Sequence, residues 1–365
     1  MRRAVASGAA VVVKIGSSSL SKESGGIDPE AIERVVEQVA QLASEGHPPV
    51  LVTSGAISAG LPVLGRSERP SDIAELQVAA SVGQTALMER YVAGFAAHGL
   101  TIGQVLLTKD VLGNRAQYLN ARAALERMLA LGIVPVVNEN DSVVVDEVRV
   151  GDNDQLAAIA SHLVNAGMLV ILTDTPGLFN DDPRFAADAK LLDAVVHTDR
   201  VLDEIRLGVS ARGFGSGGVA TKVTAARMAA FSGVPTVITS STDDGSVAAA
   251  IQGLDTGTWV DPSNRPLPAR KLWIAFGLPS AGALTVDQGA AKAISTDGRS
   301  LLAVGLRSIS GDFARGEAVE VLAEDGPLLA KGVVRIAAEE LVSSMSDGTT
   351  AGKEAIHRDD LVVLS

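Results

Sequence analysis

The fold is decided at residues 9–19, which read AAVVVKIGSSS. Five apolar residues precede a lysine, and the run then ends in a glycine and three serines. A short apolar run that is bounded by a turn signal is typical of a strand buried on both faces. We therefore predict a buried strand over residues 9–15, with Lys14 close to its end and a loop of small residues directly after it.

Outward from this strand, apolar runs alternate with amphipathic stretches up to about residue 260. Further strands are predicted at 50–53, 101–107, 133–138, 168–173 and 234–240. Helices are predicted from the Asp-Pro-Glu start at 28–30 to Gly46, at 72–98 and at 117–131, and a hairpin or edge pair at 142–150. This alternation predicts an α/β layered fold with a mainly parallel central sheet.

The pattern changes after Trp259. Residues 261–268, DPSNRPLP, contain three prolines and are typical of a linker. Short β-rich runs punctuated by glycine follow at 282–286, 301–304, 318–322 and 331–334, and they predict a small β-barrel. We expect a first domain at 1–261, a linker at 262–270 and a second domain at 271–365.

Composition excludes several classes of protein. Hydrophobic residues make up 47% of the 365 residues, which is enough for buried cores, but aromatic residues only 3%, which leaves little for stacking nucleic-acid bases. The net charge of −12 argues against a general affinity for nucleic acid or anionic membrane. The absence of cysteine excludes disulfides and thiolate metal sites.

The N-terminal apolar run does not indicate export or a membrane anchor. Lys14 interrupts it too early for a secretory signal, and no small-residue cleavage pattern follows. Nowhere does the chain approach the roughly 18 uninterrupted apolar residues that cross a bilayer. We expect a cytoplasmic protein.

Two segments are suited to phosphate groups. Gly16 lets backbone amides approach an anion beside the Lys14 ammonium group. Residues 213–222, GFGSGGVATK, place four glycines before a helix that carries Lys222. The spacing is not that of a Walker loop. The alternatives are a lysine that snorkels at a strand end and a glycine-rich segment that is merely flexible.

Acidic and amide residues gather in two further segments, NEND at 138–141 and GDND at 151–154. Such groups could hold the ammonium and polar groups of an amino acid, or orient nearby lysines. Helix capping would explain one or two of these residues but not their density. Two more strands end in small-residue turns, at 53–55 and at 173–177. The first could be merely a tight connection from strand to helix. The second lies at a strand C-terminus, where open α/β sheets bind ligands.

Residue types that are missing also restrict the chemistry. The five histidines lie apart from these motifs, and neither HExxH nor GxSxG occurs. A reaction that needs no general base tolerates this pattern. Phosphoryl transfer to a carboxylate is such a reaction, because the nucleophile is already ionised at neutral pH.

Taken in order, these segments resemble the amino-acid kinase superfamily, and within it most closely the glutamate 5-kinase family of proline biosynthesis. The resemblance covers the chain nearly end to end and rests on VVVKIGSSSL, VTSGAISAG, IVPVVNENDSV, VGDNDQLAA, LVILTDTPGLFNDDPR and GFGSGGVATKV. It implies an αβα sandwich followed by a small β-barrel that resembles a PUA domain. The implied activity is ATP-dependent phosphorylation of the side-chain carboxylate of L-glutamate to L-glutamyl 5-phosphate.

The resemblance also implies roles for individual residues. Lys14 and Lys222 would neutralise charge on the transferred phosphoryl group, and Asp154 would orient both lysines. The implied ATP-binding residues are Lys14, Thr173, Asp174, Ser216, Gly217, Gly218, Val219, Ala220, Thr221 and Lys222. The implied glutamate-binding residues are Ser54, Asp141 and Asn153. Mg2+ would bridge the phosphates, and no residue is assigned as a metal ligand.

Partners, too, are implied by the resemblance. They are a second copy of the chain in a dimer or tetramer, proline as feedback inhibitor, and glutamyl phosphate reductase as acceptor of the labile product; no membrane is expected. One alternative is an acetylglutamate or aspartate kinase, against which the PUA-like tail and the NENDSV segment speak. Another is an RNA-binding protein that keeps the kinase fold as a relic. The phosphate-site lysines argue against it, and RNA binding by the tail stays open.

Overall fold

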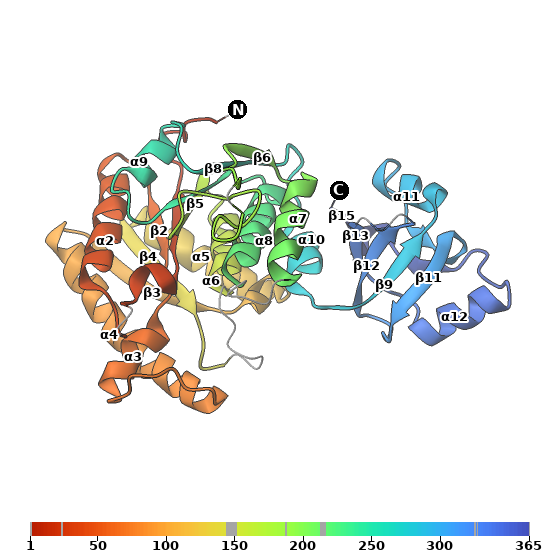
Figure 1. Cartoon of the computed structure of the whole chain (residues 1–365), viewed down its shortest axis with the longest axis horizontal. Helices are drawn as coiled ribbons and strands as arrows, with labels where there is room; N and C mark the ends of the chain where they lie inside the picture. The colour runs from red at the N-terminus through yellow and green to blue at the C-terminus, as the bar shows by residue number, and fades with distance from the viewer. Residues whose placement is uncertain are drawn as a thin grey trace. The chain divides into compact units, whose positions relative to one another are not determined.

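The computed structural model describes residues 2–22, 25–143, 152–186, 188–211, 217–324, 326 and 328–364, of which 152, 206–211 and 217 are described by their backbone alone. The chain divides into two compact units, Met1–Pro266 and Leu267–Ser365 (Figure 1). The division falls inside the proline-containing segment in which we predict the linker. The limits 261 and 271 of the two domains stay a prediction.

The first unit is built on an eight-stranded sheet with the order β3-β4-β2-β1-β5-β7-β8-β6. The strands are β1 Val11–Ile15, β2 Pro49–Val52, β3 Thr101–Leu107, β4 Ile133–Glu139, β5 Met168–Thr173, β6 Ala194–Val196, β7 Thr236–Ser240 and β8 Thr258–Asp261. Neighbouring strands are parallel except β7 and β8. The prediction of a mainly parallel sheet is confirmed, and the predicted strands 101–107 and 168–173 match β3 and β5.

Helices cover both faces of this sheet. They are α1 Ser17–Leu20, α2 Pro29–Ser44, α3 Ala56–Val63, α4 Ile73–Ala97, α5 Arg115–Ala130, α6 Asp152–Leu163, α7 Arg200–Ala211, α8 Gly217–Phe231 and α9 Ser246–Ile251, with a 3-10 turn η1 at Lys109–Leu112. Alternate residues of β1, such as Val11 and Val13, pack in one core with α2, α4 and α9. Because side chains alternate along a strand, Lys14 points to the opposite face, where α6 packs against β1 and α8.

Two of the predicted helices begin at the residues that the sequence indicates. Asp28 caps α2 by accepting from the Glu30 amide at 3.3 Å, with Pro29 in the first helical position. Asp72 caps α4 by accepting from the Glu75 amide at 3.0 Å. Helix α3 and strands β6 and β8 are additional to the prediction, and the predicted hairpin at 142–150 lies mostly outside the described residues.

The second unit contains a five-stranded sheet, β11-β9-β12-β13-β15, and a two-stranded ladder, β10-β14. Its strands are β9 Ser280–Val286, β10 Leu301–Leu302, β11 Leu306–Gly311, β12 Ala318–Ala323, β13 Leu328–Val333, β14 Glu354–Ile356 and β15 Leu361–Val363. Its helices are α10 Ala269–Leu272, α11 Gln288–Ser295 and α12 Ala338–Ser346, with short turns η2 Trp273–Gly277, η3 Ala303–Gly305 and η4 Arg358–Asp360.

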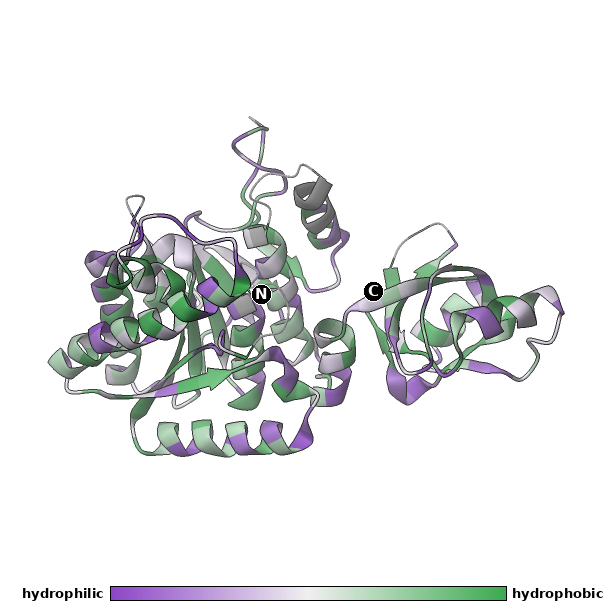
Figure 2. Ribbon diagram, turned by 90° about the horizontal axis from the view of Figure 1, so that it is seen from below, coloured by the Kyte–Doolittle hydropathy of each residue, from purple (hydrophilic) through white to green (hydrophobic). Residues whose placement is uncertain are grey.

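Each unit has a core of its own. Phe313, Val319 and Leu341 belong to a buried cluster that consists only of second-unit residues. Figure 2 shows apolar strands inside the first unit and mixed hydropathy along its outer helices. In the part of the chain that the structure describes, no helix has the length and apolar character that a membrane span requires.

Candidate active site

The carboxyl ends of the parallel strands meet at one edge of the sheet, which is where open α/β sheets bind ligands. Lys14 is the fourth residue of the five in β1, and Ser54 follows β2 closely. Asp141 follows β4, and Thr173 is the last residue of β5. The topology therefore gathers at this edge four residues that the sequence places in separate motifs.

A buried charge cluster lies at the centre of this edge. The Lys14 Nζ forms an ion pair with Oδ1 of Asp154, and the Lys222 Nζ lies 3.5 Å from Oδ2 of the same carboxylate. The Thr221 hydroxyl donates to Oδ2 at 2.7 Å. Lys14 and Asp154 are buried, and the side chain of Lys222 is 13% exposed. The charge cluster thus combines residues from three elements, β1, α6 and α8.

The N-terminal turns of two helices position this cluster. Asp154 lies in the first turn of α6, where the helix dipole favours a negative charge. Lys222 lies in the second turn of α8, and its Nζ donates to the Gly218 carbonyl at 3.2 Å. Gly16 keeps the space beside Lys14 open, since a Cβ there would lie 3.1 Å from the Lys14 Nζ.

The cluster carries one positive charge in excess. Burial by itself raises the pKa of Asp154, but the ammonium groups of Lys14 and Lys222 outweigh it and hold that pKa below its usual value. Burial lowers the pKa of Lys14, although Asp154 opposes the shift. One carboxylate between two ammonium groups suits an anionic ligand such as a phosphate.

The other described residues predicted to line a nucleotide site lie at the end of β5 and at the start of α8. The Thr173 hydroxyl donates to Oδ1 of Asp174 at 3.0 Å, so the end of β5 presents an oriented carboxylate. Asp174 is exposed, and Val219 on α8 is 38% exposed. Ser216 lies outside the described residues, and Gly217 to Lys222 form the start of α8.

The residues predicted to bind an amino acid lie on the side of β2 and β4. Ser54 is half-buried. It directly precedes Gly55, which is the N-cap residue of α3 and has a φ of +95°. Asp141 is half-buried in the turn after β4. The Asn153 Oδ1 accepts from the Glu139 amide at 3.1 Å, so α6 is joined to the end of β4. Residues 144–151 lie outside the described part.

Sequence reasoning assigned no role to Gln84 and Tyr91, two polar residues of α4 that lie beside this site. The Asn138 amide donates to the Gln84 Oε1 at 2.8 Å, and the Thr53 hydroxyl lies 2.7 Å from the Tyr91 hydroxyl. Burial raises the pKa of Tyr91, which keeps the phenol protonated. Gln84 and Tyr91 lie within the predicted helix 72–98, but helical periodicity does not indicate which strand a polar side chain meets.

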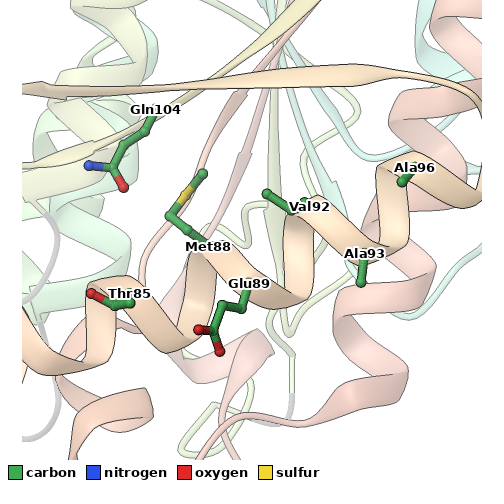
Figure 3. A pocket seen from close by; sticks show the side chains of 7 residues that line it. All are labelled: Thr85, Met88, Glu89, Val92, Ala93, Ala96 and Gln104. Carbon is green, nitrogen blue, oxygen red and sulfur yellow. The ribbon is translucent and has the colours of Figure 1, made fainter.

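A groove lies next to this region, between α4 and the edge strand β3. Its volume is about 450 Å³, and it is lined by Thr85, Met88, Glu89, Val92, Ala93, Ala96 and Gln104 (Figure 3). None of these residues belongs to the charge cluster. Among the described residues, no three histidine or acidic side chains come together in a way that could hold a metal ion.

Comparison with known proteins identifies the family of this chain. The profile of the amino acid kinase family matches residues 9–240, and that of the PUA domain matches residues 282–362. Glutamate 5-kinase of Marinomonas sp. is 43% identical over all of both chains. That of Streptomyces avermitilis is 42% identical over 100% of this chain and 98% of its own, and that of Thioalkalivibrio sulfidiphilus 45% over 97% and 96%.

A solved structure, UMP kinase from Bacillus anthracis, aligns with 70% of this chain and 97% of its own at 12% identity and a TM-score of 0.48. The family assignment rests on the profiles and on the full-length relatives, whose identities exceed 40%. The chain belongs to the amino acid kinase family, and its C-terminal part is a PUA domain.

Proposed function

We propose that this chain is an ATP-dependent glutamate 5-kinase. It transfers the γ-phosphoryl group of ATP to the side-chain carboxylate of L-glutamate and releases L-glutamyl 5-phosphate and ADP. The observation that carries the proposal is the buried Lys14–Asp154–Lys222 cluster at the carboxyl edge of the sheet. The full-length relatives named glutamate 5-kinase support the choice of substrate.

The two lysines act on the phosphoryl group during transfer. A carboxylate oxygen of glutamate forms a bond to the γ-phosphorus while the bond from that phosphorus to the ADP oxygen breaks. Negative charge is spread over the transferred oxygens, and Lys14 and Lys222 offset it. Asp154 holds both ammonium groups in place, and the reaction needs no general base because the nucleophile is already ionised.

ATP binds on the β5 and α8 side in this proposal. Thr173 and Asp174 contact the nucleotide, together with Ser216, Gly217, Gly218, Val219, Ala220, Thr221 and Lys222. A magnesium ion bound together with ATP would offset the charge of the phosphates. Since Mg2+ in kinase sites is held largely by the phosphates of the substrate, we expect it to enter the site with the nucleotide.

Glutamate binds on the β2 and β4 side. Asp141 offers an anionic acceptor to the free α-ammonium group, and Ser54 and Asn153 offer polar contacts. An N-acetylated substrate would bring a neutral amide to this place and leave Asp141 without its cation. Aspartate would place its carboxylate one methylene short of the phosphoryl group. Such mismatches reduce kcat/KM by orders of magnitude.

Trapping of the acyl phosphate tests the proposal directly. The full chain is incubated with MgATP, hydroxylamine and one of L-glutamate, N-acetyl-L-glutamate or L-aspartate, and the hydroxamate is measured. We expect product from L-glutamate at a rate at least about 100-fold above that from the other two. Equal or faster turnover of N-acetylglutamate or aspartate would refute the assignment and identify the alternative kinase.

Further proposals concern partners. The chain forms a homo-oligomer, hands its labile product to glutamyl phosphate reductase, is inhibited by proline and works in the cytoplasm. These proposals rest on the resemblance to the glutamate 5-kinase family. Sedimentation equilibrium measures the oligomer, and addition of L-proline to the hydroxamate assay measures inhibition. A monomeric chain would contradict the proposed homo-oligomer, and activity that proline does not reduce would contradict the proposed inhibition.

A further inference from the structure

Two of the segments that we propose to hold glutamate form side-chain hydrogen bonds with one stretch of α4, residues 81–91. The Tyr91 hydroxyl lies 2.7 Å from that of Thr53, which directly precedes Ser54. The Ser81 hydroxyl lies 3.0 Å from that of Ser142, which directly follows Asp141. Helix α4 thus contacts the sequence neighbours of two residues that we propose to bind glutamate, but it contains no proposed glutamate-binding residue itself.

A third connection runs from the same stretch to Asn153. The Asn138 Nδ2 donates to the Gln84 Oε1 at 2.8 Å, while the Asn138 Oδ1 accepts from the Glu139 amide at 2.9 Å. That amide also lies 3.1 Å from the Asn153 Oδ1. Gln84 therefore fixes the orientation of the Asn138 side-chain amide. The Oδ1 atoms of Asn138 and Asn153 both accept from the backbone N–H of Glu139.

Gln84 is itself held at both ends. Its Nε2 donates to the Gln104 Oε1 at 3.2 Å, and Gln104 borders the groove between α4 and β3 (Figure 3). Asn138 is only 1% exposed, so its Nδ2 has little access to water if Gln84 is removed. A buried amide without an acceptor is unfavourable, and the side chain would rotate away from the Glu139 amide to find one.

Close helix packing keeps this part of α4 in place. A Cβ on Gly83 would overlap the Ala56 carbonyl oxygen, and one on Gly60 would overlap that of Ala79. Helices α3 and α4 therefore meet backbone to backbone, directly beside Gln84. Because α3 begins right after Ser54, the position of α4 is coupled to both sides of the glutamate site.

We infer that Gln84 is a positioning residue for the amino-acid substrate. Through Asn138 it holds the end of β4 and Asn153 in the arrangement that binds glutamate, and it does not touch the nucleotide side. The inference rests on the proposed function for the identity of the substrate. It assigns a role to a residue that lies outside every motif of the sequence.

Steady-state kinetics of the full chain tests this role, with glutamate and ATP varied separately. Gln84→Met keeps the length of the side chain and removes its polar atoms. We expect it to raise KM for glutamate about fivefold to tenfold, as the loss of one hydrogen bond does, and to leave KM for ATP within twofold. Thr85→Ala, on the exposed neighbour in the same helix turn, is the control and should change neither constant.

A double-mutant cycle shows whether Gln84 acts through Asn138. Asn138→Ala alone should raise KM for glutamate, and adding Gln84→Met to it should raise KM no further. Gln84→Glu keeps an acceptor for the Asn138 Nδ2 and should stay within about threefold of the parent chain. If Gln84→Met does not fold, Gln84→Ala, which also removes the acceptor, takes its place and should raise KM for glutamate in the same way.

Unchanged KM for glutamate in Gln84→Met would overturn the inference, as would equal effects on both substrates or fully additive effects in the cycle. The unsubstituted chain in the hydroxamate assay separates this result from a failure of the proposed function. If that chain phosphorylates a different amino acid, the assignment to glutamate fails, and the role of Gln84 is judged on KM for the amino acid that is used.

Discussion

Replacing Asp154 by asparagine removes the only carboxylate between Lys14 and Lys222 among the described ion pairs. The side chain keeps its shape, but two ammonium groups then face each other, and Lys14 is 2% exposed. Removal of one partner from a buried ion pair destabilises a protein by about 3–5 kcal/mol. We expect Asp154→Asn to lower the free energy of unfolding of the first unit by this amount at pH 7 and to abolish phosphoryl transfer.

The loss of stability in Asp154→Asn depends on pH, and the pKa shifts of Asp154 and Lys14 determine the direction of this dependence. Asp154 has a lowered pKa in the folded chain, so its stabilising effect is present at neutral pH and is lost as pH falls through that folded pKa. Lys14 has a lowered pKa as well, and without Asp154 it falls further. Between this folded pKa and the ordinary value of 10.5, the unfolded chain binds more protons, so stability of the variant rises with pH. The difference from the parent chain is therefore smaller at pH 9.5 than at pH 7.

Urea unfolding followed by tryptophan fluorescence measures this difference in the first unit alone. The chain has two tryptophans, Trp259 in the first unit and Trp273 in the second. In a Trp273→Phe background, the signal reports the first unit. Glu126→Gln breaks the surface ion pair with Arg122 and is the control, which should not shift the midpoint. Equal stability of Asp154→Asn and its parent at pH 7, or a deficit that grows toward pH 9.5, would refute the reasoning.

Three further changes test other parts of the structure. Lys222→Ala should lower kcat by about 100-fold to 1,000-fold with the chain still folded, whereas an effect on KM for ATP alone would exclude a role in the transition state. Gly83→Ala should destabilise the first unit by about 1–3 kcal/mol in the urea assay, because its Cβ overlaps the Ala56 carbonyl, and no loss would disprove that close packing. A chain that ends at Pro266 should stay folded and keep kinase activity; a folded but inactive product would show that the PUA domain contributes to the site.

The charge cluster could be predicted because each of its members carries a local signal. Lys14 ends an apolar run, Asp154 starts a helix, and Lys222 follows a glycine-rich segment. Parallel strands then bring these signals to one edge, whatever the details of packing. The roles of these residues in binding and transfer stay predictions, which the substitutions above test.

The support behind the site could not be predicted in the same way. Gln84 and Tyr91 are ordinary members of a 25-residue helix, and their partners on β2 and β4 depend on how that helix crosses the sheet. The antiparallel strand β8 was missed for another reason. It ends at Asp261, directly before the prolines that indicate a linker, and the break in pattern hid the strand.

The order of the strands has a consequence for how such a site can change over evolution. β1 is the fourth of the eight strands, with β2 and β4 on one side and β5 and β7 on the other. The proposed contacts to glutamate lie on the first side, and those to the nucleotide on the second, with Lys14 on the strand between them. Substitutions that exchange the amino acid and substitutions that exchange the nucleotide therefore fall on separate halves of one sheet. We expect their effects to combine additively, so that a new acceptor can be selected without rebuilding the phosphate donor site.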